Sequence, residues 1–269
     1  MNREGAMEIR DTEFAGMVAV VTGGGGGIGL AAAESFAEQG ASVLVVGRDP
    51  AKIAAAAKAM RDRGYPASSF AGDVSSERDC LAFAEQAVKE FGRIDFLFAN
   101  AAIAAFGKLL DISSADWHTM LGINLTGAFY SARACLPHMI AGGGGVVVIT
   151  SSDCAIRTCY KSVAYVTSKH GLIGLAKSIA VDYGEHGVRS IAVVPGVVET
   201  PGLHMWYAVP GHSFETGTAK AAALSPLGRI GQPRDIGEVV TFLCSRRASW
   251  VTGATIMVDG GMTVTYGAD

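Results

Sequence analysis

The chain contains 269 residues, and 35 of them are glycine, nearly twice the share found in average proteins. Hydrophobic residues make up 49% of the chain, charged residues 17%, and only 8 residues are proline. This composition excludes a disordered or collagen-like chain, so the glycines must serve turns in a folded protein. The length is close to the upper limit for one hydrophobic core and no linker interrupts the pattern, so we predict a single domain over residues 1–269.

The charge balance and the apolar stretches limit the possible partners. The net charge is −3 and no run of five like charges occurs, which argues against a nucleic-acid partner. The longest apolar stretches, such as 17–21 and 146–149, are far shorter than the roughly 20 residues that cross a bilayer, so no membrane partner is expected. Residues 1–14 are polar and lack the apolar centre of a secretory signal, and we therefore expect a cytoplasmic location.

The cysteines and histidines show no recognised metal or disulfide pattern. The five cysteines are Cys80, Cys135, Cys154, Cys159 and Cys244, an odd number without a CxxC pair. We therefore expect neither a disulfide framework nor a zinc knuckle. The six histidines include no HExxH pair, so we expect chemistry without a metal.

Short apolar runs rich in Val, Ile and Ala alternate with stretches of helical periodicity. The runs typical of strands buried on both faces are 17–22, 41–46, 96–100, 146–151, 189–194 and 255–259, and a further strand ends at 72–74. The helical patterns cover 27–39, 50–63, 76–91, 114–139, 163–184 and 234–246. This alternation predicts an α/β fold in which a doubly wound parallel sheet of about seven strands carries helices on both faces.

Residues 201–226 have no clean helical or strand period. This segment mixes Gly and Pro with Met205, Trp206, Tyr207 and Phe214. We interpret it as a mobile insertion that covers a pocket. Its apolar side chains favour an apolar or cyclic substrate, although the same side chains would also serve to pack the insertion onto the domain.

A glycine-rich segment, TGGGGGIG at 22–29, follows the first predicted strand and opens the first predicted helix. Glycines lack a Cβ atom, so the backbone can turn sharply and approach a pyrophosphate, whose charge is then met by helix N–H groups. The position between a buried strand and an alanine-rich helix favours a phosphate-binding turn over a flexible linker. A second cluster at 142–145 lies between a helix and a strand, and we interpret it as a plain connector.

The end of the second predicted strand bears on the choice of nucleotide. In dinucleotide-binding folds a carboxylate near this point binds the ribose 2′-OH, whereas an arginine accommodates a 2′-phosphate. Asp49 followed by Pro50 is a complete helix start, and we favour this capping role for Asp49. Gly47 then occupies the position of a ribose-binding acid, and Arg48 is free to pair with a phosphate. The sequence therefore favours NADP(H), with NAD(H) as the alternative.

Two further strand ends carry candidate binding residues. Asp73, followed by Val74, is either an acceptor for the adenine amino group or a turn-forming residue. Residues 99–102, ANAA, end the fourth predicted strand with small side chains, which would let a ribose and a nicotinamide lie against the backbone.

Tyr165 and Lys169 are spaced one helical turn apart, so their side chains project from one face of a helix. A phenol with a pKa of about 10 is a poor base at neutral pH, and a neighbouring ammonium favours its phenolate. At about 4 Å and an effective dielectric constant of about 20, this attraction is about 4 kcal/mol, or roughly 3 pKa units. Tyr165 is therefore the candidate acid and base.

Two polar residues accompany this pair. Ser152 follows a predicted strand and emerges at the carboxyl edge of the sheet, where its hydroxyl would hold a carbonyl oxygen beside Tyr165. Asn124 interrupts an apolar helical stretch. It is either the anchor of a water that links Lys169 to solvent or a satisfied interior amide.

These motifs occur in order and cover nearly the whole chain. They are TGGGGGIG at 22–29, Asp73, ANAA at 99–102, Asn124, Ser152, YVTSK at 165–169, Pro195-Gly196 with Thr200, RIGQP at 229–233 and VDGG at 258–261. With this set the chain resembles the short-chain dehydrogenase/reductase family, in its compact single-domain branch. The resemblance implies one Rossmann-type NAD(P)-binding domain, usually assembled as a homotetramer.

The resemblance also implies a role for each matching residue. Tyr165 is the acid and base, and Ser152 polarises the substrate oxygen. Lys169 binds the nicotinamide ribose and lowers the pKa of Tyr165, and Asn124 holds the relay water. The implied cofactor-binding residues are Gly23, Gly27, Ile28, Gly29, Arg48, Asp73, Val74, Asn100, Ala101, Tyr165, Lys169, Pro195, Gly196, Val198 and Thr200. The candidate substrate pocket comprises Ala102, Asp153, Met205, Trp206 and Tyr207.

Two segments depart from the family pattern. Residues 99–102 read ANAA where NNAG is usual, which removes one Asn side chain and adds a methyl group. This change tightens the expected nicotinamide floor without abolishing binding. Residues 153–164 do not resemble the small-residue stretch of the ketoacyl reductases of fatty-acid synthesis, which argues against an acyl-carrier substrate.

The leading prediction is an NADP(H)-dependent oxidoreductase that interconverts a secondary alcohol and a ketone, on an apolar or cyclic small molecule. The alternatives are an NAD(H)-dependent alcohol dehydrogenase of the same family and a 3-oxoacyl thioester reductase. A catalytically silent NADP-binding sensor is more remote, because a sensor need not retain Ser152, Tyr165 and Lys169 together.

Overall fold

A computed structural model describes residues 12–207 and 213–265. Most of the polar N-terminal stretch on which the location was judged therefore lies outside the described residues. The side chains of Met205 and Trp206 also lie outside them. None of the helices in the described ranges is long and apolar enough to cross a bilayer.

The centre of the fold is a sheet of seven parallel strands in the order β3-β2-β1-β4-β5-β6-β7. The strands are β1 Val18–Thr22, β2 Ser42–Gly47, β3 Ala67–Ala71, β4 Phe96–Ala99, β5 Gly145–Thr150, β6 Val188–Pro195 and β7 Thr255–Val258. The predicted doubly wound parallel sheet is confirmed. From β1 the chain first builds outward through β2 and β3, and then crosses to β4 on the other side, so a crevice opens between β1 and β4 at their carboxyl ends.

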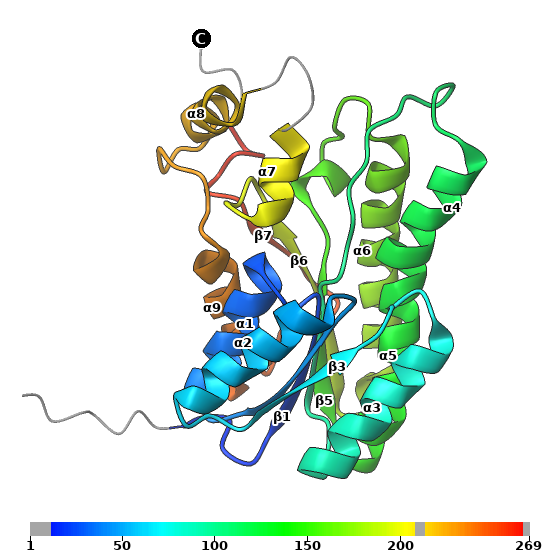
Figure 1. The fold of residues 1–269 in the computed structure, drawn as a ribbon, viewed down its shortest axis with the longest axis vertical. Coiled ribbons are helices and arrows are strands. Elements are labelled where there is room, and N and C mark those ends of the chain that lie inside the picture. Colours follow the sequence, from blue (N-terminus) through cyan, green and yellow to red (C-terminus); the bar gives the residue numbers. More distant parts are fainter. Residues whose placement is uncertain (1–11, 208–212, 266–269) are drawn as a thin grey trace, which may run out of the picture.

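Helices cover both faces of this sheet (Figure 1). They are α1 Gly27–Glu38, α2 Pro50–Asp62, α3 Glu77–Phe91, α4 Ser114–Leu121, α5 Gly127–Ala141, α6 Val163–Tyr183, α7 Pro201–Tyr207, α8 Phe214–Leu224 and α9 Pro233–Cys244. Helices α1, α2 and α9 pack on one face, and α3, α5 and α6 on the other. Helices α7 and α8 stand at the top of Figure 1, beyond the layers.

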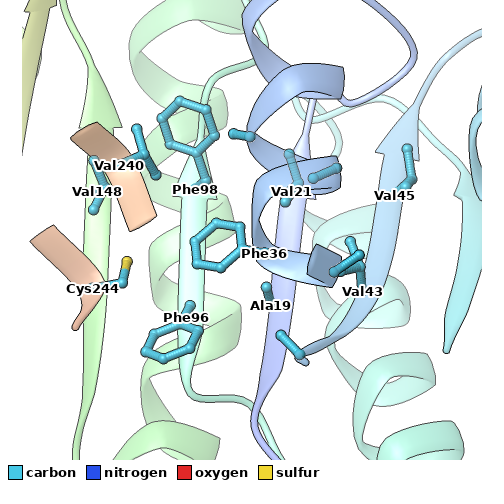
Figure 2. Packing of buried hydrophobic residues seen from close by; sticks show 14 of the residues in the cluster. Ala19, Val21, Phe36, Val43, Val45, Phe96, Phe98, Val148, Val240 and Cys244 are labelled. Carbon is cyan, nitrogen blue, oxygen red and sulfur yellow. The ribbon is translucent and has the colours of Figure 1, made fainter. Parts of the chain in front are cut away.

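Two apolar layers hold the sheet between its helices. On the side of α1 and α9, the ring of Phe36 lies between those of Phe96 and Phe98 and stacks on Phe96 with centroids 5.4 Å apart (Figure 2). On the other side, α3, α5 and α6 pack a second cluster that contains Leu44 and Leu97. The inner strands β1, β2, β4, β5 and β6 are thus buried on both faces, which explains why they are continuous apolar runs in the sequence, whereas the edge strands β3 and β7 are only partly buried.

The start of α2 has the predicted capping structure. The Asp49 side chain accepts hydrogen bonds from the backbone N–H groups of Ala51 and Lys52, at 3.1 and 3.2 Å, and Pro50 occupies the first helical position. The Asp49 carboxylate is therefore committed to the helix start, and Arg48 is the residue of this turn that remains free to face a ligand.

The long helix predicted over 114–139 is interrupted. Helices α4 and α5 are joined by a π-helical turn at Gly122–Thr126, which contains Asn124. A π turn inserts an extra residue into a helix and often occurs at functional sites. The apolar periodicity did not predict the interruption, because the helix axis continues through it.

The segment 201–226 contains regular structure that its sequence pattern did not predict. It forms α7 and α8, and residues 208–212 between them lie outside the described ranges. Phe214 of α8 stacks on His204 of α7, with ring centroids 3.9 Å apart, and meets Tyr207 edge-on at 6.1 Å. Phe214 therefore packs the two helices together, as the second interpretation of these aromatic residues expected.

Candidate active site

The glycine-rich turn between β1 and α1 is closely packed against the chain around it. Gly23 and Gly27 have φ angles of +68° and +53°, in the left-handed region that favours glycine. A Cβ atom on Gly29 would lie 2.2 Å from the carbonyl oxygen of Gly23, and one on Gly23 would lie 2.9 Å from the Cα atom of Ala101. The turn thus needs glycine at these positions, and it places the N-terminus of α1 at the crevice between β1 and β4. This cradle fits the pyrophosphate of a dinucleotide.

Polar side chains tie the ends of β1, β4 and β5 together beside this turn. The Thr22 hydroxyl accepts hydrogen bonds from the backbone N–H groups of Asn100 and Ala101, at 3.0 and 3.2 Å. The Asn100 side chain donates to the carbonyl of Thr22 and accepts from the hydroxyl of Thr150. These bonds fix the small-residue segment 99–102 as the floor of the crevice. The side chain of the single asparagine of this segment thus links the ends of β1 and β5.

A small cavity of about 120 Å³ lies at the ends of β1, β2 and β3. It is lined by Gly23, Gly47, Arg48, Gly72, Asp73, Val74, Ala101, Ala102 and Ile123. The structure thus brings together the predicted residues for the adenosine half of a dinucleotide. Asp73 also forms the turn that the sequence left as one of two options, because its carboxylate accepts hydrogen bonds from the N–H and hydroxyl groups of Ser75, at 2.9 and 2.8 Å.

A larger cavity of about 380 Å³ opens beyond the ends of β4, β5 and β6. Its lining includes twelve of the predicted site residues: Ile28, Asn100, Ala102, Ser152, Asp153, Tyr165, Lys169, Pro195, Gly196, Val198, Thr200 and Tyr207. Gly27 and Gly29 belong to the glycine-rich turn and are not part of the cavity lining. Asn124 is not part of the lining either. The predicted catalytic and nicotinamide-facing residues therefore meet in one cavity.

Ser152, Tyr165 and Lys169 converge from two elements. Ser152 directly follows β5, and the other two side chains lie one turn apart on α6. Ser152 and Tyr165 are hydrogen-bonded through their hydroxyl groups. The Lys169 ammonium lies 5.6 Å from the centre of the Tyr165 ring and donates a 2.8 Å hydrogen bond to the carbonyl of Thr150. The serine and tyrosine hydroxyls are thus placed to act on the same oxygen atom.

The pKa values of Tyr165 and Lys169 are shifted mainly by burial. Burial raises the pKa of Tyr165, the hydrogen bond to Ser152 opposes this effect, and the negative charge of Asp153 adds to it. Burial also lowers the pKa of Lys169 to about 8, because a desolvated ammonium is unfavourable. The sequence-based argument counted the attraction between the two charges and not the loss of water, which in this structure raises the pKa of Tyr165 on balance.

Asn124 is a satisfied interior amide. Its Oδ1 atom accepts a 2.8 Å hydrogen bond from the backbone N–H of Ile103, and its Nδ2 atom donates to the Ile103 carbonyl at 2.9 Å and to the Ser168 hydroxyl at 3.2 Å. The side chain fastens the π turn to the segment after β4 and to α6. A water held here would therefore have to bind backbone atoms, because the amide is already used.

The loop between Ser152 and Tyr165 contains contacts that the sequence reasoning missed. Cys154 and Cys159 form a disulfide with Cα atoms 5.3 Å apart. Arg157 donates a 2.9 Å hydrogen bond to Asp153, and all four of these side chains line the cavity. The four-residue spacing of Asp153 and Arg157 was the available signal for the ion pair. The cysteine count gave no signal for the disulfide, because an odd number of cysteines without a CxxC pair does not single out two residues five positions apart.

The other cysteines and the charged residues indicate no second centre. Cys80, Cys135 and Cys244 are buried free thiols, and burial raises the pKa of Cys80 to about 11. Within residues 12–207 and 213–265, no group of three or more His, Cys, Asp and Glu side chains could hold a metal ion.

The doubly wound sheet with a glycine turn at its crevice defines a dinucleotide-binding α/β protein. A family model described as enoyl-(acyl carrier protein) reductase matches residues 23–263. The cis-4-hydroxycyclohexanecarboxylate dehydrogenase of Sinomonas cyclohexanicum is 39% identical over 251 residues, which cover 93% of this chain and 98% of the relative. The cyclohexanol dehydrogenase of Acinetobacter sp. strain SE19 is 34% identical over 260 residues, which cover 95% and 98%.

A solved structure shows the same similarity. The aldohexose dehydrogenase of Thermoplasma acidophilum, in its ligand-free form, has a TM-score of 0.87 and 31% identity, covering 96% of this chain and 98% of that one. The chain therefore belongs to the short-chain dehydrogenase/reductase family. It is an oxidoreductase of the kind that acts on CH–OH groups, and the dehydrogenases of this family use NAD(P).

Proposed function

We propose that the protein is an NADP(H)-dependent oxidoreductase that interconverts a secondary alcohol and a ketone, on an apolar or cyclic small molecule. The observation that carries this proposal is the convergence of Ser152, Tyr165 and Lys169 in the cavity that the nicotinamide-facing backbone also lines. The ring-alcohol dehydrogenases among its relatives support a cyclic substrate.

The proposed mechanism divides the chemistry between cofactor and protein. The nicotinamide, when bound, accepts or delivers the hydride at the carbinol carbon. Ser152 holds the substrate oxygen by a hydrogen bond, and Tyr165 takes the hydroxyl proton during oxidation or returns it during reduction. Lys169 would bind the nicotinamide ribose and form the next link of the proton path.

The preference for NADP(H) is supported by the end of β2. Arg48 lines the small cavity, and the carboxylate of Asp49 is committed to capping α2. A Cβ atom on Gly47 would lie 2.9 Å from the Cγ2 atom of Ile53, so an acid at this position would displace that side chain. An arginine at this position, beside an Asp49 carboxylate that caps α2, suits a 2′-phosphate.

The proposal treats residues 1–269 as one nucleotide-binding domain whose segment 201–226 covers the substrate. Helix α7 supports this cover, because its residues Leu203 and Tyr207 line the cavity. A homotetramer is proposed from the family resemblance, and a cytoplasmic location from the sequence.

The test is turnover of ring alcohols by the intact protein and by Tyr165→Phe, with NADP⁺ and NAD⁺ in parallel. We expect Tyr165→Phe to lower kcat by several orders of magnitude while nucleotide affinity stays nearly unchanged, because the lost hydroxyl transfers the proton and is only one of many contacts proposed for the nucleotide. Tyr183→Phe, at the far end of the same helix, serves as the matched control. Tight nucleotide binding without turnover of any carbonyl or alcohol would favour the sensor alternative.

A further inference from the structure

Two side chains that line the larger cavity, those of Asp153 and Arg157, carry opposite charges. Among the described residues that line it, the charged ones are Asp153, Arg157 and Lys169. Lys169 is buried and donates to the carbonyl of Thr150. Arg157 is therefore the cation of this lining that can face a substrate.

Asp153 forms an ion pair with Arg157 that leaves most N–H donors of the arginine free. One terminal nitrogen of Arg157 donates to Asp153 at 2.9 Å, and the arginine side chain is 41% exposed, whereas that of Asp153 is only 10% exposed. A guanidinium has five N–H donors arranged to bind a carboxylate through two parallel hydrogen bonds. The described contact of the Arg157 guanidinium uses one of its two terminal nitrogens. The remaining N–H groups can donate to a second carboxylate.

The position of Arg157 is tied to the reacting group. Asp153 accepts a 3.1 Å hydrogen bond from the Ser152 hydroxyl, and the backbone N–H of Arg157 donates to the Asp153 carbonyl at 3.1 Å. The disulfide between Cys154 and Cys159 closes a short ring that contains Arg157. The guanidinium is thus held at a set place relative to Ser152, which lowers the entropy that a substrate anchor would lose on binding.

We propose that Arg157 is a specificity-determining residue that binds a carboxylate on the substrate, remote from the carbinol carbon. The preferred substrates are then hydroxy acids and oxo acids whose reacting carbon lies in an apolar skeleton. This inference rests on the proposed function for the reacting end of the substrate. The apolar residues Ala102, Ile103, Ala104 and Leu203 line the cavity around the skeleton. Asp153 is a positioning residue, because it acts through Arg157.

The test compares an acid with its neutral ester. We would measure kcat/KM for 4-oxocyclohexanecarboxylate and for its methyl ester in the unchanged protein, in Arg157→Gln and in Lys161→Gln. Lys161 lies in the same loop but not in the cavity lining, so it is the matched control. We expect Arg157→Gln to lower kcat/KM for the acid by about ten- to a hundredfold through KM, with little change for the ester.

A second variant separates recognition from damage to the site. Because Arg157→Gln leaves Asp153 buried without its cation, the double variant Asp153→Asn with Arg157→Gln removes both charges. In the double variant, as in Arg157→Gln, kcat/KM for the acid should no longer exceed kcat/KM for the ester. Equal losses for acid and ester in both variants, or no preference between them in the unchanged protein, would overturn the proposal.

A binding measurement distinguishes failure of this inference from failure of the proposed function. Cyclohexanecarboxylate lacks a reacting hydroxyl, so its binding in the presence of NADP⁺ can be followed by calorimetry without turnover. Arg157-dependent binding of this acid together with no turnover of any ring alcohol would refute the proposed reaction and retain the carboxylate site. Turnover of the ester with no Arg157-dependent binding of the acid would refute the carboxylate site alone.

Discussion

Lys169 combines a catalytic position with an energetic cost that can be measured. Its ammonium is buried under the cavity and donates one hydrogen bond, to the carbonyl of Thr150. Burial lowers its pKa from 10.5 to about 8. Replacing it by methionine, which has a similar length and no charge, should therefore change how the free energy of unfolding depends on pH.

The direction follows from which state binds the proton. Below pH 8 both states hold it, and the folded protein bears the full cost of a buried charge, about 3 kcal/mol for a pKa lowered by this amount. Between pH 8 and 10.5 the folded lysine has lost its proton while the unfolded lysine still holds it, so stability rises with pH. Above pH 10.5 the cost has vanished. From pH 7 to pH 10 the protein should gain about 2.5 kcal/mol relative to Lys169→Met.

Urea unfolding of both proteins at pH 7 and pH 10 measures this difference. The lost hydrogen bond to Thr150 shifts the Lys169→Met stability by a similar amount at both pH values, so it cancels in the comparison. Both proteins should carry Tyr165→Phe, because burial raises the pKa of that phenol and its ionisation would overlap. Lys177→Met, at an exposed position of α6, is the control. A Lys169→Met effect that is the same at both pH values would refute the reasoning.

Two further predictions concern the nucleotide. Arg48→Ala should raise the KM for NADPH at least tenfold and hardly change the KM for NADH. Initial rates with both nucleotides measure this difference. Equal effects on the two KM values would exclude the 2′-phosphate role. Gly29→Ala should weaken NADP⁺ binding by about ten- to a hundredfold in a calorimetric titration, because its Cβ atom would lie 2.2 Å from the Gly23 carbonyl oxygen and force the turn to shift. Gly26→Ala, where a Cβ atom meets nothing within 4 Å of the protein, is the matched substitution for folding. Equal NADP⁺ affinity in Gly29→Ala and the unchanged protein would show that the turn tolerates the shift.

The fold was predictable because it depends on patterns that are local in the sequence. Strands buried on both faces must be apolar throughout, so most of them could be located as short apolar runs, whereas the edge strand β3, with the sequence ASSFA, could be placed only by its end. The helix start at Asp49 was likewise predictable, because a cap and a proline at the first position act within four residues. The π turn at Asn124 was not, since it lies in a stretch of apolar and small residues that also fits a continuous helix.

In the candidate site, too, one part could be predicted from the sequence and another part could not. Tyr165 and Lys169 lie on one turn of a helix, and Ser152 follows a strand, so their convergence could be inferred from spacing and from the carboxyl edge of the sheet. The ionisation of the pair could not be inferred, because it depends on the water that the surrounding chain excludes. A sequence gives the spacing between two charges along a helix but not the depth at which they are buried.

The loop between Ser152 and Tyr165 shows where substrate choice can vary without loss of chemistry. The catalytic hydroxyls are fixed by β5 and α6, whereas Asp153, Arg157 and the disulfide belong to the irregular chain between these elements. Because the sheet and helix hold the reacting groups, the loop can carry different anchors while proton transfer stays the same. This separation explains why the family could be identified from the motifs, while the residue proposed to select the substrate became visible only as a contact in the structure.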